Sequence, residues 1–254
     1  MPKLGKGPRA NRALSPILFI SDLHLTVDRE WANQTFLRFL RSEACSADAL
    51  YILGDLFDFW LGDDDLDDPF HRTVVDRLRE LTDSGCAVFF MHGNRDLLIG
   101  NEFAQAAGIR LLPDPALVDV FGTPTLLMHG DTLCTADRDY QLFRAHVHSE
   151  SWQRETLAKP LAERRAIALK LRERSETSKQ AKPAQIMDVS PAAVEQAFTQ
   201  YECSHLIHGH THRPARHEHL VAGKPCERWV LSDWYQHGEY LRTAPTGWER
   251  VALS

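Results

Sequence analysis

The stretch ILFISDLHL, residues 17–25, combines a short apolar run with two candidate metal ligands. A run of four apolar residues indicates a strand that is buried on both faces. Asp22 and His24 follow it directly, two positions apart. In open α/β sheets, ligands bind beyond the carboxyl ends of the strands. The stretch therefore predicts a buried sheet with a functional site at its edge.

Four further apolar runs repeat this pattern, and helical patterns lie between them. The runs are ALYIL (49–53), AVFFM (87–91), TLLM (125–128) and HLI (205–207). Residues 30–44, 69–85 and 101–108 carry apolar residues at the three and four spacing of helices. Alternating strands and helices predict an α/β fold around a parallel or mixed sheet. We expect a hairpin at 118–128 and terminal strands at 229–234 and 239–253, so a second, more antiparallel layer should be present.

The segment 137–189 interrupts this alternation, because it contains no strand pattern in more than fifty residues. We interpret it as a helical insertion, or lid, in a core made of residues 16–136 and 190–254. Residues 1–15 are expected to form a flexible N-terminal tail.

Composition limits the class of protein. The chain has 254 residues, of which 43% are hydrophobic and 25% charged, as in a soluble globular protein with one main domain. No apolar run reaches the roughly 18 residues that span a bilayer, and the N-terminus lacks the apolar stretch of a signal peptide. The five cysteines form no CxxC pair, which favours reduced thiols. We therefore expect a cytoplasmic protein.

Polar residues follow the other apolar runs as well. Asp55, Asn94 and His129 each come shortly after a run, and His210 and His212 follow the last one. If HGHTH is extended, alternate side chains point the same way, so His210 and His212 could face one point. Seven side chains would then meet at one edge of the sheet: Asp22, His24, Asp55, Asn94, His129, His210 and His212.

The donor types narrow the choice of metal. Carboxylates, imidazoles and one carboxamide, without a thiolate, suit Mn²⁺, Fe²⁺, Zn²⁺ or Mg²⁺. Seven protein ligands are too many for one catalytic ion with an open position, and they suit two ions about 3.5–4 Å apart. Asp55 is the natural bridge, because a carboxylate can offer one oxygen to each cation.

The motifs SDLHL, GDLFDFW, GNRD, HGD and HGHTH, in this order, resemble those of the calcineurin-like metallophosphoesterases. The resemblance runs from Ile17 to Trp234 and implies a four-layer α/β/β/α sandwich. It also implies which residues bind each ion. Asp22, His24, Asp55 and His212 would hold one ion, and Asp55, Asn94, His129 and His210 the other. His208 would then lie outside the set of ligands.

The longer strings GDLFDFWLGDDD, HGDTLCT and IMDV (186–189) are similar to the subfamily that cleaves UDP-2,3-diacylglucosamine in lipid A biosynthesis. This resemblance implies hydrolysis of the pyrophosphate bond to 2,3-diacylglucosamine 1-phosphate and UMP, through water activated by two ions, most simply Mn²⁺, and attack at the UMP-side phosphorus. The implied catalytic residues are Asp55, Asn94, Arg95 and His129. The implied substrate contacts are Asn94, Arg95, Asp137, Ser175, Lys179, Lys182 and His210.

Arg95 adds a constraint on the leaving group. Many members of the superfamily have histidine at this position of the GNRD motif, and a histidine can protonate a departing alkoxide. Arginine stays protonated in proteins, so Arg95 can neutralise charge but cannot donate a proton. The leaving group should therefore be good without a proton, as a phosphate leaving a phosphoanhydride is. The alternative is a structural arginine paired with Asp96.

Residues 154–182 carry nine Lys or Arg against four Glu, although the net charge of the chain is −6. A basic amphipathic helix is typical of a segment that lies on an anionic membrane. The expected partners are therefore the lipid-linked nucleotide sugar and the anionic cytoplasmic face of the inner membrane, with no nucleic acid and no obligate protein partner. The basic residues concerned are Arg164, Arg165, Lys170, Arg172 and Arg174.

Two other functions remain open from the sequence. One is a calcineurin-like phosphodiesterase or nucleotide pyrophosphatase that acts on soluble substrates, against which the long insertion argues. The other is a non-catalytic binding module on the membrane surface, which would need a broken ligand set. All seven ligands are present.

Overall fold

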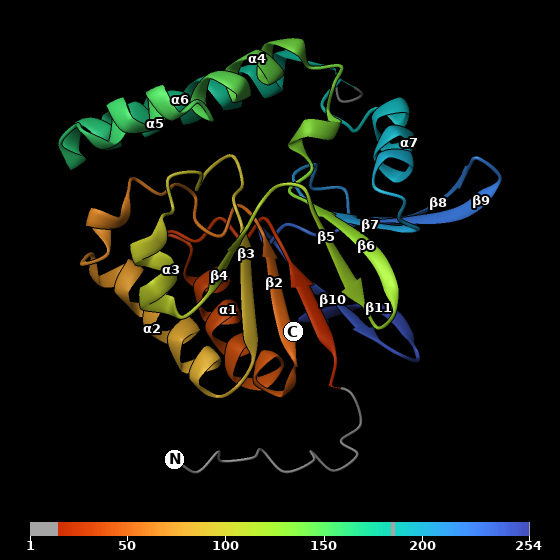
Figure 1. Ribbon diagram of the computed structural model, residues 1–254. Coiled ribbons are helices and arrows are strands. Elements are labelled where there is room, and N and C mark those ends of the chain that lie inside the picture. Colours follow the sequence, from red (N-terminus) through yellow and green to blue (C-terminus); the bar gives the residue numbers. More distant parts are fainter. Residues whose placement is uncertain (1–14, 184–185, 254) are drawn as a thin grey trace, which may run out of the picture.

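Two sheets form the centre of the computed structural model, which describes residues 15–183 and 186–253 (Figure 1). The first sheet has the strand order β11-β10-β1-β2-β3-β4. Its strands are β1 (Ile17–Ile20), β2 (Ala49–Leu53), β3 (Ala87–Met91), β4 (Arg110–Leu112), β10 (Gly238–Ala244) and β11 (Gly247–Leu253). Strands β1 to β4 run parallel, and the β10-β11 hairpin joins β1 antiparallel.

The second sheet has the order β5-β6-β7-β9-β8. Its strands are β5 (Ala116–Val120), β6 (Thr123–Met128), β7 (His205–His208), β8 (Ala215–Val221) and β9 (Lys224–Val230). The three central strands are parallel, while both edge strands are antiparallel to their neighbours. The expected hairpin is confirmed as β5-β6. The expected strand at 229–234 is wrong beyond Val230, where the chain leaves the sheet.

Helices cover the outer face of each sheet, so that four layers result. Helices α1 (Glu30–Ser42), α2 (Pro69–Asp83) and α3 (Asn101–Ala107) share one buried cluster with the first sheet. Helix α7 (Pro191–Gln200) shares another with the second sheet, and a third cluster fills the space between the sheets. The mixed α/β fold with two sheets, expected from the sequence, is confirmed.

Three aromatic residues between the sheets connect β1, β2 and β3. Phe19 stacks on Tyr51 with ring centroids 5.0 Å apart, and Tyr51 stacks on Phe89 at 4.7 Å. These residues are also register partners in the parallel ladder. A slip by one residue would turn each strand's buried side chains to the other face. The stack therefore helps to bring the ends of the three strands to the same edge.

The segment that follows β6 in the chain is helical. It contains α4 (Arg138–Val147), α5 (Glu150–Leu157) and α6 (Leu161–Ala181). Figure 1 shows these helices, in green, lying beyond one end of the sheets. Arg164 on α6 bonds to the Leu61 carbonyl and to both oxygens of Asp64, and Arg172 bonds to Asp58. All three partners belong to the loop after β2. Helix α6 is thus tied to the end of the sheet where that loop lies.

These contacts correct the expectation that the basic residues of α6 form one membrane-facing set. The Arg164 side chain is only 3% exposed and pairs with Asp64. Arg172 is also engaged by a buried carboxylate. Arg165 and Lys170 are exposed, while the side chain of Arg174 is not among the described ones. Charge counting could not separate the arginines that bind the core from those that face outward.

Short elements complete the fold. In the described part of the chain these are the 3₁₀ helices η1 (Ala44–Ser46), η2 (Asp63–Asp65) and η3 (Asp131–Leu133). The expected N-terminal tail, residues 1–15, lies outside the described residues except for Ser15. Across the described ranges, no helix combines the length and the apolar character needed to cross a bilayer.

Candidate metal centre

All seven side chains expected as ligands meet at the carboxyl ends of five strands. Asp22 and His24 follow β1, Asp55 follows β2, and Asn94 follows β3. His129 follows β6, and the last two follow β7. The two sheets therefore each contribute ligands, and the side chains form two neighbouring groups.

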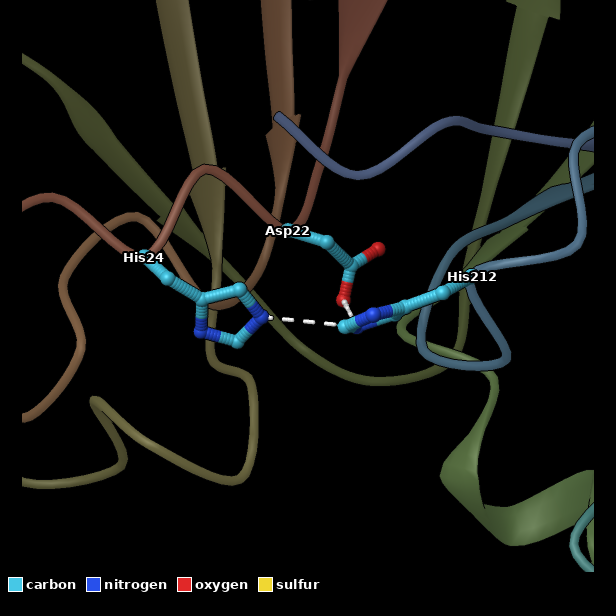
Figure 2. A group of neighbouring side chains, drawn as sticks. All are labelled: Asp22, His24 and His212. Carbon is cyan, nitrogen blue, oxygen red and sulfur yellow. Dashed lines mark hydrogen bonds and ion pairs between the residues drawn. The ribbon is translucent and has the colours of Figure 1, made fainter. Parts of the chain in front are cut away.

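The first group is Asp22, His24 and His212, whose ligand atoms all lie within 4.8 Å of one another. The Nε2 atoms of the two imidazoles are 3.4 Å apart, and Nε2 of His212 is 3.4 Å from Oδ1 of Asp22. Figure 2 shows the three side chains pointing toward one another. Asp22 is fully buried, and this oxygen accepts no hydrogen bond from the described residues. A buried carboxylate oxygen facing two imidazole nitrogens fits a divalent cation between them.

The second group is Asn94, His129 and His210. The Asn94 Oδ1 atom lies 3.2 Å from Nε2 of His129 and 3.0 Å from Nδ1 of His210. The other ring nitrogen of His129, Nδ1, is 2.8 Å from the Leu53 carbonyl. A histidine that donates Nδ1–H to a carbonyl presents its unprotonated Nε2 to a metal. The ring is therefore oriented for binding a cation.

Asp55 lies between the two groups. Its Oδ2 is 3.8 Å from Nε2 of His24, and its Oδ1 is 4.0 Å from Nε2 of His129. Oδ1 also accepts a hydrogen bond of 2.8 Å from the backbone N–H of Arg95. Asp22, His129 and Asp55 themselves form a compact triad. One oxygen of Asp55 thus faces each group, which is the placement that a bridging carboxylate requires.

The backbone at these residues is strained. Among the described residues, eight that are not glycine have positive φ, and five of them are expected ligands. Their φ angles are 57° at Asp22, 49° at His24, 53° at Asp55, 66° at His210 and 54° at His212. This conformation costs roughly 1–3 kcal/mol per residue and concentrates at functional sites. The strain therefore marks the cluster independently of residue type.

The positive φ angles also correct the geometry expected for HGHTH. Strand β7 ends at His208, so His210 and His212 do not sit at alternate positions of an extended chain. Both still reach the site, because the left-handed turns direct them there. His208 belongs to neither ligand group. It is fully buried, with Nε2 3.0 Å from Nη1 of Arg228.

Two glycines allow the backbone to approach the carboxylates. A Cβ atom at Gly93 would lie 2.1 Å from Oδ1 of Asp55. At Gly209 it would lie 1.8 Å from Oγ of Ser21 and 2.2 Å from Oδ2 of Asp22. No side chain fits at such distances. The glycines of the GNRD and HGHTH motifs are therefore required by the close packing around the carboxylates.

The site concentrates negative charge, because the buried Asp22 and Asp55 carboxylates lie close together. Burial raises the pKa of Asp55, and the neighbouring Asp22 carboxylate adds to this. Burial alone would lower the pKa of His129, but the Asp55, Asp131 and Asp22 carboxylates raise it to about 9. Both shifts show that the cluster favours added positive charge. A bound divalent cation would supply that charge.

Arg95 does not pair with Asp96. The Asp96 carboxylate, fully buried, accepts backbone N–H groups from Gly93, Leu56 and Asp55 at 2.9, 2.7 and 3.3 Å. It therefore holds the loops that carry two of the expected ligands. The Arg95 Nε atom is buried and has no hydrogen-bond partner in the described part of the chain. This guanidinium is left available for an anion beside Asp55.

The remaining residues expected to contact substrate divide into two sets. Asp137 is the N-cap of α4, and both of its carboxylate oxygens bond to Nζ of Lys182. The structure thus brings these two together. The side chains of Ser175 and Lys179 lie outside the described ones, although their backbone belongs to α6.

Sequence reasoning missed a set of residues that supports the second group. Asp131 accepts hydrogen bonds from the Tyr140 hydroxyl at 2.9 Å and from Nε of Arg144 at 2.6 Å. The Tyr140 ring lies 5.6 Å from the ring of His210. In the sequence, only the position of Asp131 as the third residue of the HGD motif pointed to these contacts. Its two partners, on α4, are recognisable only in the fold.

Comparison with known proteins gives a consistent result. Residues 15–214 match the family described as calcineurin-like phosphoesterase. A relative from Cellvibrio japonicus is 49% identical over 91% of this chain and 95% of its own length. Relatives from Stenotrophomonas maltophilia and Aromatoleum aromaticum are 49% and 50% identical, over 93% and 89% of this chain and 98% and 91% of their own lengths. All three are named UDP-2,3-diacylglucosamine hydrolase. This chain therefore belongs to the calcineurin-like phosphoesterase family.

Proposed function

We propose that this protein hydrolyses the pyrophosphate bond of UDP-2,3-diacylglucosamine, giving 2,3-diacylglucosamine 1-phosphate and UMP for lipid A biosynthesis. The observation that carries the proposal is the name shared by relatives about half identical to the chain over nearly its full length. The complete cluster of seven ligand side chains supports it, because a chain that kept the fold without the chemistry would have no need of that cluster. The enzyme is accordingly a hydrolase.

Membership of the family implies divalent metal ions. We assign one ion to Asp22, His24, Asp55 and His212, and the other to Asp55, Asn94, His129 and His210. When bound, such ions lower the pKa of a water molecule and neutralise charge on phosphoryl oxygens. Mn²⁺ is our choice of metal, supported by the oxygen and imidazole donors and the absence of thiolates from the two groups.

Arg95 acts on the transferred phosphoryl group. Its buried Nε, which has no hydrogen-bond partner among the described residues, supports a contact with the oxygens that become more negative in the transition state. Since a guanidinium cannot release a proton at neutral pH, the leaving phosphate departs as an anion. Asn94, whose Oδ1 faces His129 and His210, can in addition donate its amide N–H to a phosphoryl oxygen.

We propose that five residues bind the sugar phosphate side of the substrate: Asp137, Ser175, Lys179, Lys182 and His210. The support is the position of the Asp137–Lys182 pair, which joins the start of α4 to the end of α6. The backbone N–H of Tyr140 donates to Asp137 at 3.1 Å, and the Tyr140 ring lies 5.6 Å from that of His210, so the pair lies near the second group of ligands.

Residues 137–189 are proposed to act as a lid over a core of residues 16–136 and 190–254. Its tethers support this, because Arg164 and Arg172 hold α6 against the loop that follows Asp55. Several apolar side chains of these helices are exposed, including Leu142 (72%), Leu157 (44%) and Leu169 (47%). Exposed apolar residues on these helices suit the acyl chains of the substrate.

The protein is proposed to work as a peripheral protein on the cytoplasmic face of the inner membrane, since a diacylated substrate resides in the bilayer. The exposed Arg165 and Lys170 and the apolar residues of α4 to α6 support a contact with anionic lipid. We propose no obligate protein partner and no nucleic acid partner.

The test is hydrolysis of UDP-2,3-diacylglucosamine in mixed micelles containing Mn²⁺, carried out in water enriched in ¹⁸O. We expect UMP and 2,3-diacylglucosamine 1-phosphate, with the label in UMP, because attack is assigned to the UMP-side phosphorus. Label in the lipid product would overturn that assignment. Hydrolysis of soluble phosphodiesters or nucleotide diphosphates, with none of the lipid substrate, would favour the soluble-substrate enzyme. Lipid binding without any turnover would favour the binding module.

A further inference from the structure

The segment Asp233–Tyr235 covers the first group of ligands, although no motif drew attention to it. The backbone N–H of Trp234 donates to the Asp22 carbonyl at 3.1 Å. The Trp234 side chain is fully buried and packs edge-on against Phe36 and Phe39, with centroids 6.3 and 5.8 Å away. This anchor fixes the positions of the residues on either side of Trp234.

Asp233 lies behind the ring of His212. Its Oδ2 is 3.4 Å from Nδ1, while Nε2 on the other side of the ring faces Asp22 and His24. The other oxygen of Asp233 accepts the backbone N–H of Tyr235 at 3.1 Å. A carboxylate at one imidazole nitrogen sets the tautomer and raises the basicity of the other. Asp233 therefore prepares Nε2 of His212 for a cation.

Tyr235 covers both histidines of the first group. Its ring lies 5.3 Å from the ring of His24 with an interplanar angle of 30°, and 5.7 Å from the ring of His212 at 39°. Tyr235 is 47% exposed, so burial of its own surface does not explain its position. Its contacts restrict the rotation of the two imidazoles instead.

Arg29, at the start of α1, connects these parts. Its Nη1 donates to the carbonyls of Leu23 and His24 at 2.7 and 2.9 Å, and its Nη2 donates to the Trp234 carbonyl at 2.6 Å. Its guanidinium also lies over the Tyr235 ring, 4.3 Å from the centroid. The planar fork of arginine suits three convergent carbonyls, and lysine cannot reproduce it. Arg29 thereby holds the strained backbone of His24 against the Trp234 loop.

From these contacts we infer that Arg29, Asp233 and Tyr235 are positioning residues that set the metal affinity of the first group, Asp22, His24 and His212, and leave the second group unaffected. The inference rests on the proposed two-ion site but needs no substrate. Loss of a residue that orients a metal ligand weakens binding by about 10- to 100-fold. The three residues should therefore act on one of two binding events.

The test is calorimetric titration of the full-length, chelator-treated protein with MnCl₂, alongside Mn²⁺ electron paramagnetic resonance to count bound ions. We expect two binding events in the unmodified protein. Asp233→Asn, which keeps an acceptor for Tyr235 but removes the charge, should weaken one event about tenfold or more and leave the other unchanged. Asp28→Asn, an exposed carboxylate next to Arg29, is the matched charge control and should change neither event.

Two variants at the exposed residue Tyr235 test whether a loss of affinity comes from misfolding. Tyr235→Ala should weaken the same event as Asp233→Asn, and Tyr235→Phe should restore it, because the ring makes the contacts. Arg29→Lys should behave like Tyr235→Ala. The melting temperature of the metal-free Tyr235 variants should stay at that of the unmodified protein. Unchanged affinity in Tyr235→Ala, or equal weakening of both events, would overturn the inference. Failure to hydrolyse the lipid substrate would count against the proposed function alone.

Discussion

Lys182 donates from Nζ to both carboxylate oxygens of Asp137, at 2.6 and 2.8 Å, across 45 residues of sequence. The pair is largely shielded, with side chains 22% and 11% exposed. It closes the helical segment by joining its first residue to a residue near its end. Any substrate group that binds Lys182 must share the ammonium with Asp137 or replace it.

We predict that Lys182→Met raises KM for the lipid substrate about tenfold or more, since a charge-assisted hydrogen bond contributes roughly 1.5–3 kcal/mol. The turnover number should change much less, because the residue does not face the reacting phosphorus in our assignment. Steady-state kinetics of Lys182→Met, Asp137→Asn and the double variant will check this. Fully additive effects would contradict the direct coupling seen here.

Asp55→Ala should lower the turnover number by at least about 100-fold, since each of its oxygens faces one ligand group. Metal counting by atomic emission should show fewer than two ions per chain. Near-normal turnover with both ions retained would refute the bridge. Asp119→Asn, a carboxylate in strand β5, serves as the control and should leave both quantities unchanged.

Arg95→Ala should lower turnover of the nucleotide sugar by roughly 10²- to 10³-fold, as loss of a group that stabilises transition-state charge does. Arg95→His should not restore it, because a phosphate leaving group needs no proton. The rates of both variants on the lipid substrate and on an alkyl phosphodiester will separate charge stabilisation from protonation of the leaving group. Full rescue by histidine on the lipid substrate would show that the leaving-group argument is wrong.

His208→Ala should affect stability and leave metal binding intact. The imidazole is fully buried and contacts Arg228, so truncation leaves a cavity and removes a partner of a buried guanidinium. We expect the free energy of unfolding to fall by about 2–4 kcal/mol. Urea denaturation and Mn²⁺ titration at low temperature are the measurements. His210→Ala should show the reverse pattern, with weakened metal binding and little loss of stability.

Arg165→Gln with Lys170→Gln should weaken binding to anionic vesicles by roughly 30-fold, at about 1 kcal/mol for each basic residue near the surface. Hydrolysis of micellar substrate should persist. Sedimentation with vesicles at low and moderate salt will measure the effect. Arg242→Gln with Arg250→Gln, on the β10-β11 hairpin, removes equal charge elsewhere and should bind as the unmodified protein does. Vesicle binding that changes neither with salt concentration nor with removal of Arg165 and Lys170 would exclude the electrostatic contact.

The apolar strands were the most predictable part of the fold. Strands β1, β2 and β3 begin and end where their apolar runs do, because strands buried on both faces carry no polar residues. Strand β8, with the sequence ARHEHLV, was not expected, since its exposed face is polar and its position depends on pairing with β9. Strand β4 is three residues long and too short to give a pattern.

The expected ligands could be named from the sequence because each follows a strand, but their conformations could not. His210 and His212 reach the site through left-handed turns rather than along a strand. The sequence also did not show which way the Arg164 side chain points, since composition does not distinguish a membrane-facing arginine from one that binds Asp64. Asp233 and Tyr235 gave no signal, because their contacts form only in the fold: Asp233 lies against His212 in the loop after β7, and Tyr235 stacks on His24, far away in the sequence.

The left-handed backbone at the ligand positions has a consequence for how this fold changes over evolutionary time. Glycine adopts such angles without strain, so replacing Asp22 or His212 by glycine removes a local conformational penalty at the same moment as it removes a ligand. Loss of a ligand and loss of folding are therefore separable at His212, whereas Asp22 also accepts the backbone N–H of His210 and supports the loop after β7. A descendant that abandoned the chemistry would keep, or even gain, a stable scaffold, which leaves this architecture free to be reused for binding alone.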